Sequence, residues 1–305
     1  MTAGDDSRIL AVVTGPTASG KTSLAISIAE HFGTEIVSAD SRQIYRDIPI
    51  GTAAPSPEER SRVRHHLVGM LGLDQPYSAA RFEADALASL AGIWTRSRVA
   101  VLCGGSMMYV DALCNGMDDL PTISDTTREY VLRLLEQHGL DGVLAQLQIV
   151  DPVYFDEVDR ANTRRVVHAL EICLEARVPY STLRTGAKRR RDFRIVKFMI
   201  DRPREELFAR INARVDAMMA AGLEQEARRA FAQGNFNSLN TVGYKEMAAY
   251  FAGAMDYATA VARIGKNTRV YAKKQLTWLN RDPDIIRLNP ATAEADAIAA
   301  VETML

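Results

Sequence analysis

The residues best suited to chemistry lie in one short stretch near the start of the chain. It reads Gly15-Pro16-Thr17-Ala18-Ser19-Gly20-Lys21-Thr22. The glycines allow a tight turn whose backbone N–H groups face an anion. Lys21 supplies a positive charge, and the Thr22 hydroxyl can hold Mg²⁺. The stretch therefore predicts a phosphate-binding loop.

The segments on either side of this loop predict how it is held. The apolar run Ile9-Leu10-Ala11-Val12-Val13 before it is typical of a buried strand. After it, apolar residues recur at helical spacing, so the positive end of a helix points back at the loop. The loop alone leaves open whether the phosphate belongs to a nucleotide or to another compound.

Asp40 is the best candidate for a reactive carboxylate. It follows a short apolar run at 35–38 that predicts a second strand. Because the carboxyl ends of parallel strands meet at one edge of a sheet, we expect Asp40 beside the phosphate loop. A helix N-cap is the structural alternative for this aspartate, but its position favours catalysis or metal support.

A third buried strand, predicted at 99–103, ends in Gly104-Gly105-Ser106. A P-loop hydrolase would carry a metal-binding aspartate at this point, and here there is none. The pattern argues against nucleotide hydrolysis and leaves Asp40 as the carboxylate of the crevice.

The stretch from 119 to 194 shows helical faces and no buried strand, and strand character resumes at 195–200. We therefore predict an α/β fold, with a P-loop NTPase-like parallel sheet core flanked by helices and an inserted helical domain. The core comprises 1–118 and 195–305, and the insertion comprises 119–194. The basic run Lys188-Arg189-Arg190-Arg191, with Arg194 and Lys197 close behind, indicates contact with a phosphate backbone.

Composition narrows the class of protein. The 305 residues are 47% hydrophobic and 25% charged, with a net charge of -1, which is typical of a globular protein and not of a nonspecific nucleic-acid coat. The three cysteines show no paired short spacing, which argues against a disulfide framework or a Cys-based zinc site. Without an apolar run of about 18 residues, we expect no membrane association and a cytoplasmic location.

Eight motifs in order resemble the tRNA dimethylallyltransferase family, also called tRNA isopentenyltransferases, over about residues 8 to 281. They are GPTASGKT, DSRQIYR, GTAAPS, HHL, GGSMMY, the Leu120-Pro121 turn, NTVGYKE and TRVYAKKQLTWLN. The resemblance implies transfer of a dimethylallyl group from dimethylallyl diphosphate to the exocyclic amine of the adenosine 3′ to the tRNA anticodon. Diphosphate is released, and Mg²⁺ is the implied cofactor.

The resemblance also implies roles for the loop and for Asp40. Asp40 would be the general base, Thr17 and Thr22 would position the diphosphate, and Arg214 would neutralise it as it leaves. Thr22 would hold Mg²⁺, directly or through water. The whole loop would bind the diphosphate: Gly15, Pro16, Thr17, Ala18, Ser19, Gly20, Lys21 and Thr22.

For tRNA, the resemblance implies contacts with the anticodon stem-loop by a protein that we expect to be a monomer. Ser106, His168 and Lys245 vary from the family's more usual residues. The implied tRNA-binding positions are Asp40, Ser41, Arg42, Gln43, Ser106, Arg128, Arg164, Arg165, Val166, Val167, His168, Asn240, Thr241, Val242, Gly243, Tyr244 and Lys245.

Three other functions share some of these features. A P-loop small-molecule kinase would share the loop, an adenylate isopentenyltransferase would share the chemistry on a free nucleotide, and a noncatalytic RNA-binding protein could keep a vestigial loop. ATP turnover would identify the kinase, and labelling of free AMP would identify the adenylate isopentenyltransferase.

Overall fold

The computed structural model describes residues 7–305, which form two compact units. The first contains the described residues up to Cys114 together with Arg190–Leu305, and the second is Asn115–Arg189. The helical insertion predicted at 119–194 is this second unit, with boundaries a few residues earlier. Residues 190–194 belong to the first unit because Arg191 donates hydrogen bonds to the Leu113 carbonyl oxygen and to Glu83.

The first unit is built on a parallel sheet with strand order β3-β2-β4-β1-β5-β6. The strand that precedes the phosphate loop, β1, lies in the middle, and all of its residues are buried. The prediction of a P-loop-like parallel sheet is confirmed. The strands are β1 Ile9–Thr14, β2 Ile36–Ser38, β3 His65–His66, β4 Val99–Gly104, β5 Arg194–Ile200 and β6 Ile285–Leu288.

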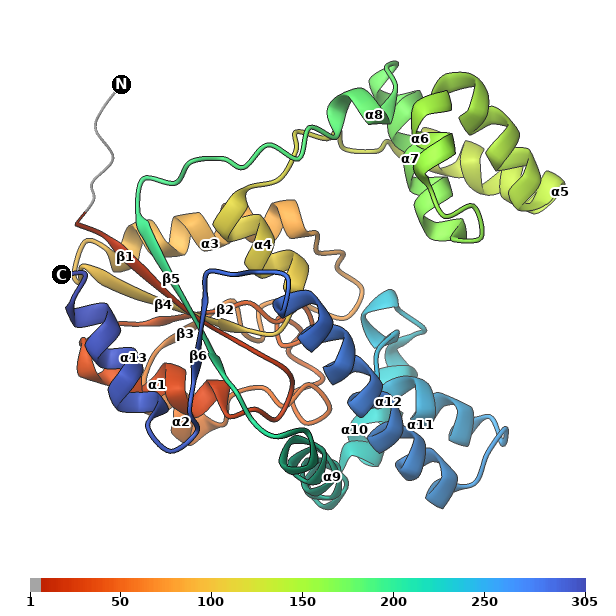
Figure 1. Cartoon of the computed structure of the whole chain (residues 1–305). Helices are drawn as coiled ribbons and strands as arrows, with labels where there is room; N and C mark the ends of the chain where they lie inside the picture. The colour runs from red at the N-terminus through yellow and green to blue at the C-terminus, as the bar shows by residue number, and fades with distance from the viewer. Residues whose placement is uncertain (1–6) are drawn as a thin grey trace. The chain divides into compact units, whose positions relative to one another are not determined.

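Helices cover both faces of this sheet (Figure 1). On one face lie α3 and α4, and on the other lie α1 and α13, which pack against each other. These layers bury the apolar strands and hold the loop between β1 and α1 at the carboxyl edge. The covering helices are α1 Lys21–His31, α2 Pro57–Arg62, α3 Ala79–Ile93, α4 Met107–Asn115 and α13 Ala293–Glu302.

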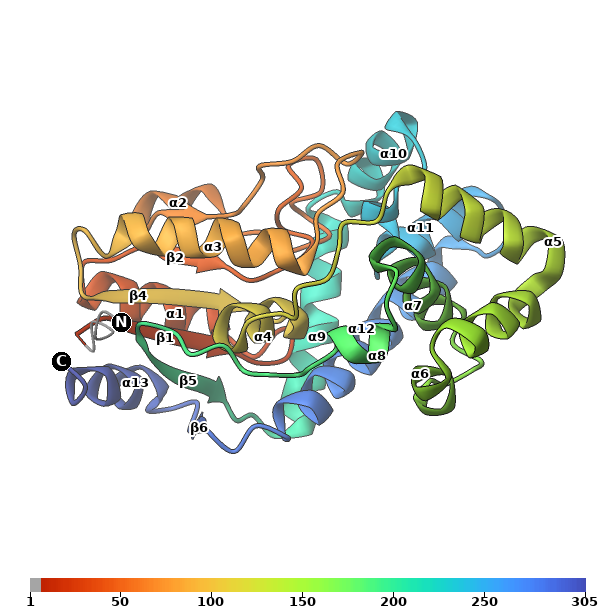
Figure 2. The same ribbon diagram turned by 90° about the horizontal axis from the view of Figure 1, so that it is seen from above.

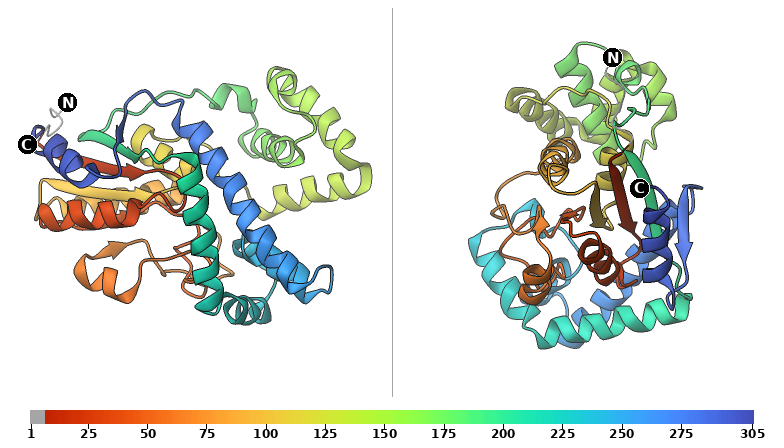
Figure 3. Two further views of the ribbon diagram at one scale, coloured as in Figure 1. Left: turned by 60° about the horizontal axis from the view of Figure 1, so that its bottom comes forward. Right: turned by 90° about the vertical axis from the view of Figure 1, so that its left-hand side faces the viewer.

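A group of helices from the last third of the chain lies at the carboxyl edge of the sheet, where the arrowhead of β4 points (Figure 2). Two long helices, α9 and α12, pack side by side there (Figure 3). They bring residues far along the chain to the phosphate loop. The elements are α9 Arg204–Ala220, α10 Leu223–Gln233, the 3₁₀ turn η1 Asn237–Leu239, α11 Tyr244–Phe251 and α12 Tyr257–Leu279.

The second unit is entirely helical in its regular structure. Its core includes Val131, Val143 and Leu147 from α5 and Val166 and Leu170 from α7. The two helical faces expected around 131–135 and 143–147 belong to α5, which is broken at Gly139, where φ is +64°. The helices are α5 Asp125–Val150, α6 Pro152–Glu157, α7 Thr163–Ala176 and α8 Tyr180–Leu183.

Most side chains of the basic run at the end of the insertion form ion pairs or hydrogen bonds with other residues of the protein. Arg191 forms a buried ion pair with Glu83 at 2.6 Å, and Lys197 pairs with Asp282 at 2.6 Å. Arg189 pairs with Asp119, and Arg194 donates to the Met304 carbonyl oxygen. The predicted phosphate contact is therefore wrong for Arg191, Arg194 and Lys197, whose charges are neutralised or bonded internally.

No helix within residues 7–305 is both long enough and apolar enough to span a bilayer.

A buried carboxylate connects the helices at the carboxyl edge to the segment between β2 and α2. Glu226 is 1% exposed and accepts hydrogen bonds from the Ile50 and Gly51 N–H groups, each at 2.8 Å. The Tyr244 hydroxyl donates to the same carboxylate at 2.5 Å. A side chain at position 51 would collide with Tyr244, so glycine is required there.

We predict that Tyr244→Phe lowers the free energy of unfolding by about 1.5–3 kcal/mol, the range for a hydrogen bond to a charged group. Urea denaturation measures this change. The matched control is Tyr250→Phe, whose hydroxyl has no hydrogen-bond partner in the described chain and whose loss should cost less than about 0.5 kcal/mol. Equal effects of the two substitutions would contradict a stabilising hydrogen bond from Tyr244 to Glu226.

Candidate functional site

The phosphate loop connects β1 to α1 in a strained conformation. Ala18 has a φ of +64°, which is uncommon for a residue other than glycine. Two arginines hold this turn: Arg202 donates to the Ser19 carbonyl oxygen at 2.7 Å, and Arg210 donates to the Ala18 carbonyl oxygen at 2.8 Å. These two contacts hold the loop in this shape.

Two cations converge on this loop. The Lys21 ammonium donates to the Pro16 carbonyl oxygen at 3.2 Å, and the Arg214 guanidinium donates to the Thr17 hydroxyl at 3.3 Å. Burial lowers the pKa of Lys21, and the nearby Arg214 lowers it further. Burial also lowers the pKa of Arg214. Desolvated charges of one sign make this a strong site for an anion.

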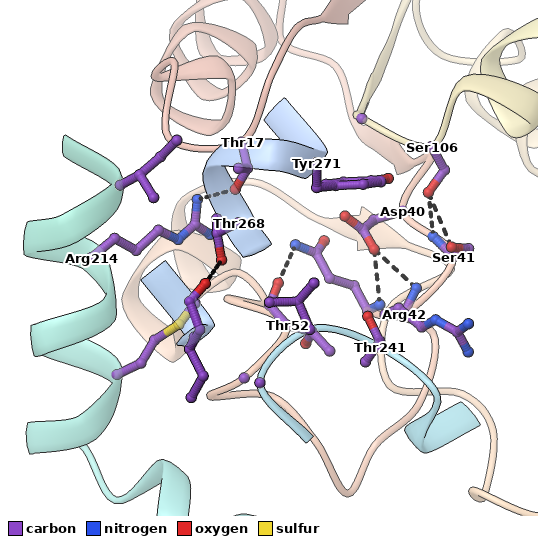
Figure 4. Close-up of a pocket in the computed structure, with 18 of the residues that line it drawn as sticks. Thr17, Asp40, Ser41, Arg42, Thr52, Ser106, Arg214, Thr241, Thr268 and Tyr271 are labelled. Atoms are coloured by element: carbon purple, nitrogen blue, oxygen red, sulfur yellow. Dashed lines mark hydrogen bonds between the residues drawn. The ribbon is translucent and has the colours of Figure 1, made fainter. Parts of the chain in front are cut away.

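Asp40 lies across the pocket from Arg214 (Figure 4). Its Oδ1 accepts from the backbone N–H groups of Arg42 at 2.9 Å and Gln43 at 3.4 Å. Its Oδ2 has no hydrogen-bond partner within residues 7–305. Asp40 can therefore have both a structural and a catalytic role, because Oδ1 fixes the turn while Oδ2 remains available to a substrate.

The loop after β4 approaches its neighbours too closely for side chains. A Cβ at Gly104 would collide with the Ala39 backbone, and one at Gly105 would lie 2.5 Å from Nε2 of Gln275. Gln275, which is 2% exposed, bridges two loops: it accepts from the Thr17 N–H at 3.0 Å and donates to the Gly105 carbonyl oxygen at 2.8 Å. This contact sets the spacing between the phosphate loop and the β4 loop.

These groups surround a pocket of about 460 Å³ in the first unit. One side carries the phosphate-loop residues and the other carries Asp40 with its neighbours. Helices and a loop also contribute an apolar wall. That wall is made of Ile211, Val215, Met218, Leu223, Val242 and Ile264.

Many of the predicted RNA-binding residues line this pocket, although Gln43 has a structural role. Its amide donates to the Thr52 and Ala53 carbonyl oxygens and accepts from Ser38, so its polar atoms are committed within the protein. Ser106 accepts from the Ser41 N–H at 2.8 Å. The predicted residues that line the pocket are Asp40, Ser41, Arg42, Gln43, Ser106, Asn240, Thr241, Val242, Gly243 and Lys245.

Two of the predicted RNA-binding residues have side chains with no exposed surface. Tyr244 and Val166 are both 0% exposed, one bonded to Glu226 and the other packed in the core of the second unit. Neither side chain is therefore exposed for contact with RNA.

The other predicted RNA-binding residues lie in the second unit. Arg128 is exposed near the start of α5, where Ser124 hydrogen-bonds Glu175 near the end of α7. Arg164 and Arg165 are exposed in the first turn of α7, Val167 is half-buried, and His168 is exposed beside Glu171. Arg128 therefore lies near the C-terminal end of α7, whereas Arg164 and Arg165 lie at its N-terminal end.

Four polar residues of the pocket were not individually predicted. Thr52 lies in the GTAAPS motif, and Thr268, Tyr271 and Gln275 lie in TRVYAKKQLTWLN. The motifs could have directed attention to these segments, but helical spacing does not say which face of α12 meets a loop more than 200 residues earlier. Burial raises the pKa of Tyr271 to about 12, so its hydroxyl stays protonated at neutral pH.

The pocket offers little to bind a metal by protein ligands alone. No group of three or more His, Cys, Asp or Glu side chains in the described part of the chain could hold a metal ion. Cys103 lines the pocket, but burial raises the pKa of its thiol to about 11, so it is not a thiolate at neutral pH.

The fold and this pocket define a P-loop protein of the group-transfer class. Its crevice is lined by Lys21, Arg214 and the Asp40 carboxylate, yet β4 is followed by glycine and serine instead of the aspartate of P-loop hydrolases. The chain belongs to the tRNA dimethylallyltransferase family, since the family model for IPP transferase matches residues 43–282.

Similar proteins agree with this family. A tRNA dimethylallyltransferase of Parabacteroides distasonis is 50% identical over 286 residues, which are 94% of this chain and 96% of the relative. One of Phocaeicola vulgatus is 51% identical over 281 residues, 92% of this chain and 94% of the relative.

Solved structures with the same fold point to this family too. The full-length tRNA isopentenylpyrophosphate transferase of Bacillus halodurans has a TM-score of 0.71 at 29% identity, over 98% of this chain and 96% of that one. A eukaryotic dimethylallyltransferase acting on tRNA has a TM-score of 0.82 at 25% identity, over 97% of this chain and 78% of that one.

We predict that Gln275→Glu weakens the binding of inorganic diphosphate, measured by calorimetry, on the order of tenfold or more. The carboxylate cannot donate to the Gly105 carbonyl oxygen and adds negative charge beside the anion site, and an unpaired buried group alone costs about 1–3 kcal/mol. The matched control, Gln233→Glu, changes an exposed residue outside the pocket and should bind as the wild type does. Wild-type binding by Gln275→Glu would show that the bridge does not shape the site.

Proposed function

We propose that this chain transfers the dimethylallyl group of dimethylallyl diphosphate to N6 of the adenosine 3′-adjacent to the anticodon of tRNA. The bond between C1 and the diphosphate oxygen breaks, and its electron pair leaves with the diphosphate. The C1–N6 bond forms, and the N6 proton passes to Asp40. The observation that carries this proposal is the pocket itself, in which Arg214 lies across from the Asp40 carboxylate and apolar side chains complete the lining (Figure 4).

The phosphate loop and Arg214 suit a diphosphate leaving group. Charge accumulates on the leaving oxygens as the allylic bond breaks, so a fixed guanidinium beside the loop stabilises the transition state more than the ground state. Because Gln275 already occupies the Thr17 N–H, that amide is not free for a further phosphate. This supports a shorter anion than a nucleoside triphosphate, and it speaks against the kinase alternative.

The apolar wall suits the five-carbon group. Side chains such as Ile211, Met218 and Ile264 give the dimethylallyl tail a surface away from water. A wall without charged side chains also keeps water from the electrophilic carbon, which would otherwise be hydrolysed.

Asp40 is suited to act as the general base. Its Oδ1 is fixed by two backbone N–H groups, and its Oδ2 remains free to accept the N6 proton. The attacking amine is a poor nucleophile, so removal of its proton as the new bond forms lowers the barrier.

The donor set fits Mg²⁺ as a cofactor. Thr22 lines the pocket and offers a hydroxyl oxygen, and Mg²⁺ in such sites is held mainly by substrate phosphates and water. When bound, the ion would neutralise part of the charge on the leaving diphosphate.

The adenosine must leave its stack to reach this pocket. Unstacking costs a few kcal/mol and is easiest in a single-stranded loop, which supports the anticodon loop as the target. The ring of Tyr271 lies beside Asp40 and offers a face on which an adenine could stack (Figure 4). Asn240, Thr241 and Lys245 border the same opening.

We further propose that the protein acts as a cytoplasmic monomer. The three cysteines are free thiols, as suits a reducing compartment.

We predict that the protein, supplied with Mg²⁺ and radiolabelled dimethylallyl diphosphate, labels an anticodon stem-loop with adenosine 3′ to the anticodon. The same stem-loop with guanosine at that position is the control and should remain unlabelled. AMP and ATP are assayed in parallel. Labelling of AMP in place of the stem-loop would identify an adenylate isopentenyltransferase and overturn the tRNA assignment.

We predict that Asp40→Asn lowers kcat by roughly 10² or more, the scale for loss of a general base. Asparagine can still accept the Arg42 N–H bond, so the turn and diphosphate binding should persist. Asp47→Asn changes a nearby aspartate that does not line the pocket and serves as the matched control. Near-normal kcat in Asp40→Asn, measured in single turnovers, would remove Asp40 from the proton transfer.

A further inference from the structure

A second cavity, of about 320 Å³, adjoins the pocket within the first unit. The two share Asn240 and Lys245 as lining residues, so they are neighbours across these two side chains. The remaining lining comes from the end of α10, the segment that follows it and α11. No role has yet been assigned to this cavity.

Phe236 supplies an aromatic wall of the second cavity, and its position is fixed by the neighbouring backbone. Gly234 ends α10 with a φ of +148°, and a Cβ there would lie 2.7 Å from Cζ of the Phe236 ring. The ring packs into the space that this glycine leaves, and it is only half-buried. The exposed part of the ring is available to a ligand.

The floor of the cavity is tied to the Asp40 loop. The Arg42 guanidinium donates to the carbonyl oxygens of Asn237 at 3.2 Å and Ser238 at 3.1 Å. The buried Ser238 hydroxyl donates to the Leu73 carbonyl oxygen at 2.7 Å. The second cavity therefore keeps a fixed position relative to the carboxylate of the first.

The polar side chains around the ring have no partners in the part of the chain that the structure describes. The side-chain amides of Asn235, Asn237 and Asn240, and the ammonium of Lys245, make no hydrogen bond or ion pair within residues 7–305. Amides can pair with the edges of a base, an aromatic face can stack on it, and a lysine can contact the phosphate that follows. Together these are the groups that recognise an unstacked nucleotide.

We propose that this cavity is a subsite for the nucleobase next to the target adenosine, with Phe236 as its stacking surface. Lys245, at the border of the two cavities, contacts the phosphate that joins the two nucleotides. The proposal rests on the proposed function and adds to it, because occupation of this subsite would hold the strand with the target base extended into the pocket. It also makes the identity of a neighbouring base part of substrate choice.

The test combines protein variants with abasic RNA. Binding of the anticodon stem-loop is measured for wild type and Phe236→Ala, using the intact RNA and two forms that lack the base on the 5′ or the 3′ side of the target. Since a stacked base is worth about 1–3 kcal/mol, Phe236→Ala should raise the Kd for intact RNA roughly 5- to 150-fold. Removal of the base that occupies the subsite should weaken the wild type similarly and should add little in Phe236→Ala.

Two further variants separate stacking from folding. Phe236→Tyr keeps the aromatic face and should bind as the wild type does, whereas Phe236→Leu keeps apolar volume without that face and should behave like Phe236→Ala. Binding of dimethylallyl diphosphate should be unchanged in all of them, which reports an intact first pocket.

The outcomes distinguish this subsite from the proposed function. If the wild type does not modify the stem-loop, the proposed function fails whatever Phe236 does. If the wild type modifies it but neither abasic RNA shows coupling to Phe236, the subsite is overturned and the proposed function stands. An equal loss in Phe236→Tyr and Phe236→Leu would likewise reduce Phe236 to a packing role.

Discussion

The anion site depends on two positive charges that are buried away from water. Lys21 and Arg214 both have lowered pKa values because burial disfavours their charged forms, and the charge of Arg214 lowers the pKa of Lys21 further. Asp40 partly offsets this cost, since its charge raises the pKa of both. A bound diphosphate would offset far more, so the cost of burying these two charges favours binding of the anion. The interaction also gives selectivity, because a neutral ligand would leave the cations uncompensated.

The rest of the fold can be understood as what keeps these charges in place. β1 in the centre of the sheet and α1 behind it present the loop, while Arg202 and Arg210 from the region of α9 hold its carbonyl oxygens. Gln275 from α12 fixes the distance to the β4 loop, which lies so close that only glycine fits there. The anion site is therefore rigid, and such preorganisation is what lets an electrostatic site act in the transition state.

The same packing decides which polar residues face the ligand and which serve the structure. Gln43 and Tyr244 belong to segments that border the site, but their polar atoms bond to the protein and shape those segments. Arg42 bonds the turn at 237–239 and so joins the pocket to its neighbouring cavity. Gln43 and Tyr244 thus belong to functional motifs yet serve to hold the loops that border the site.

The sequence by itself determined the features that are encoded locally. Fully apolar strands, the glycine-rich loop, Asp40 at a strand end and the return of strand character after the insertion all follow from short patterns, and the fold that they predict is confirmed. Only the tertiary structure decided which long-range partners meet. Thr17 and Gln275 are 258 positions apart, and Arg191 and Glu83 are 108 apart, so no periodicity could pair them. The burial of Val166 and Tyr244 has the same cause, since the side of a helix that is covered depends on elements packed from elsewhere in the chain.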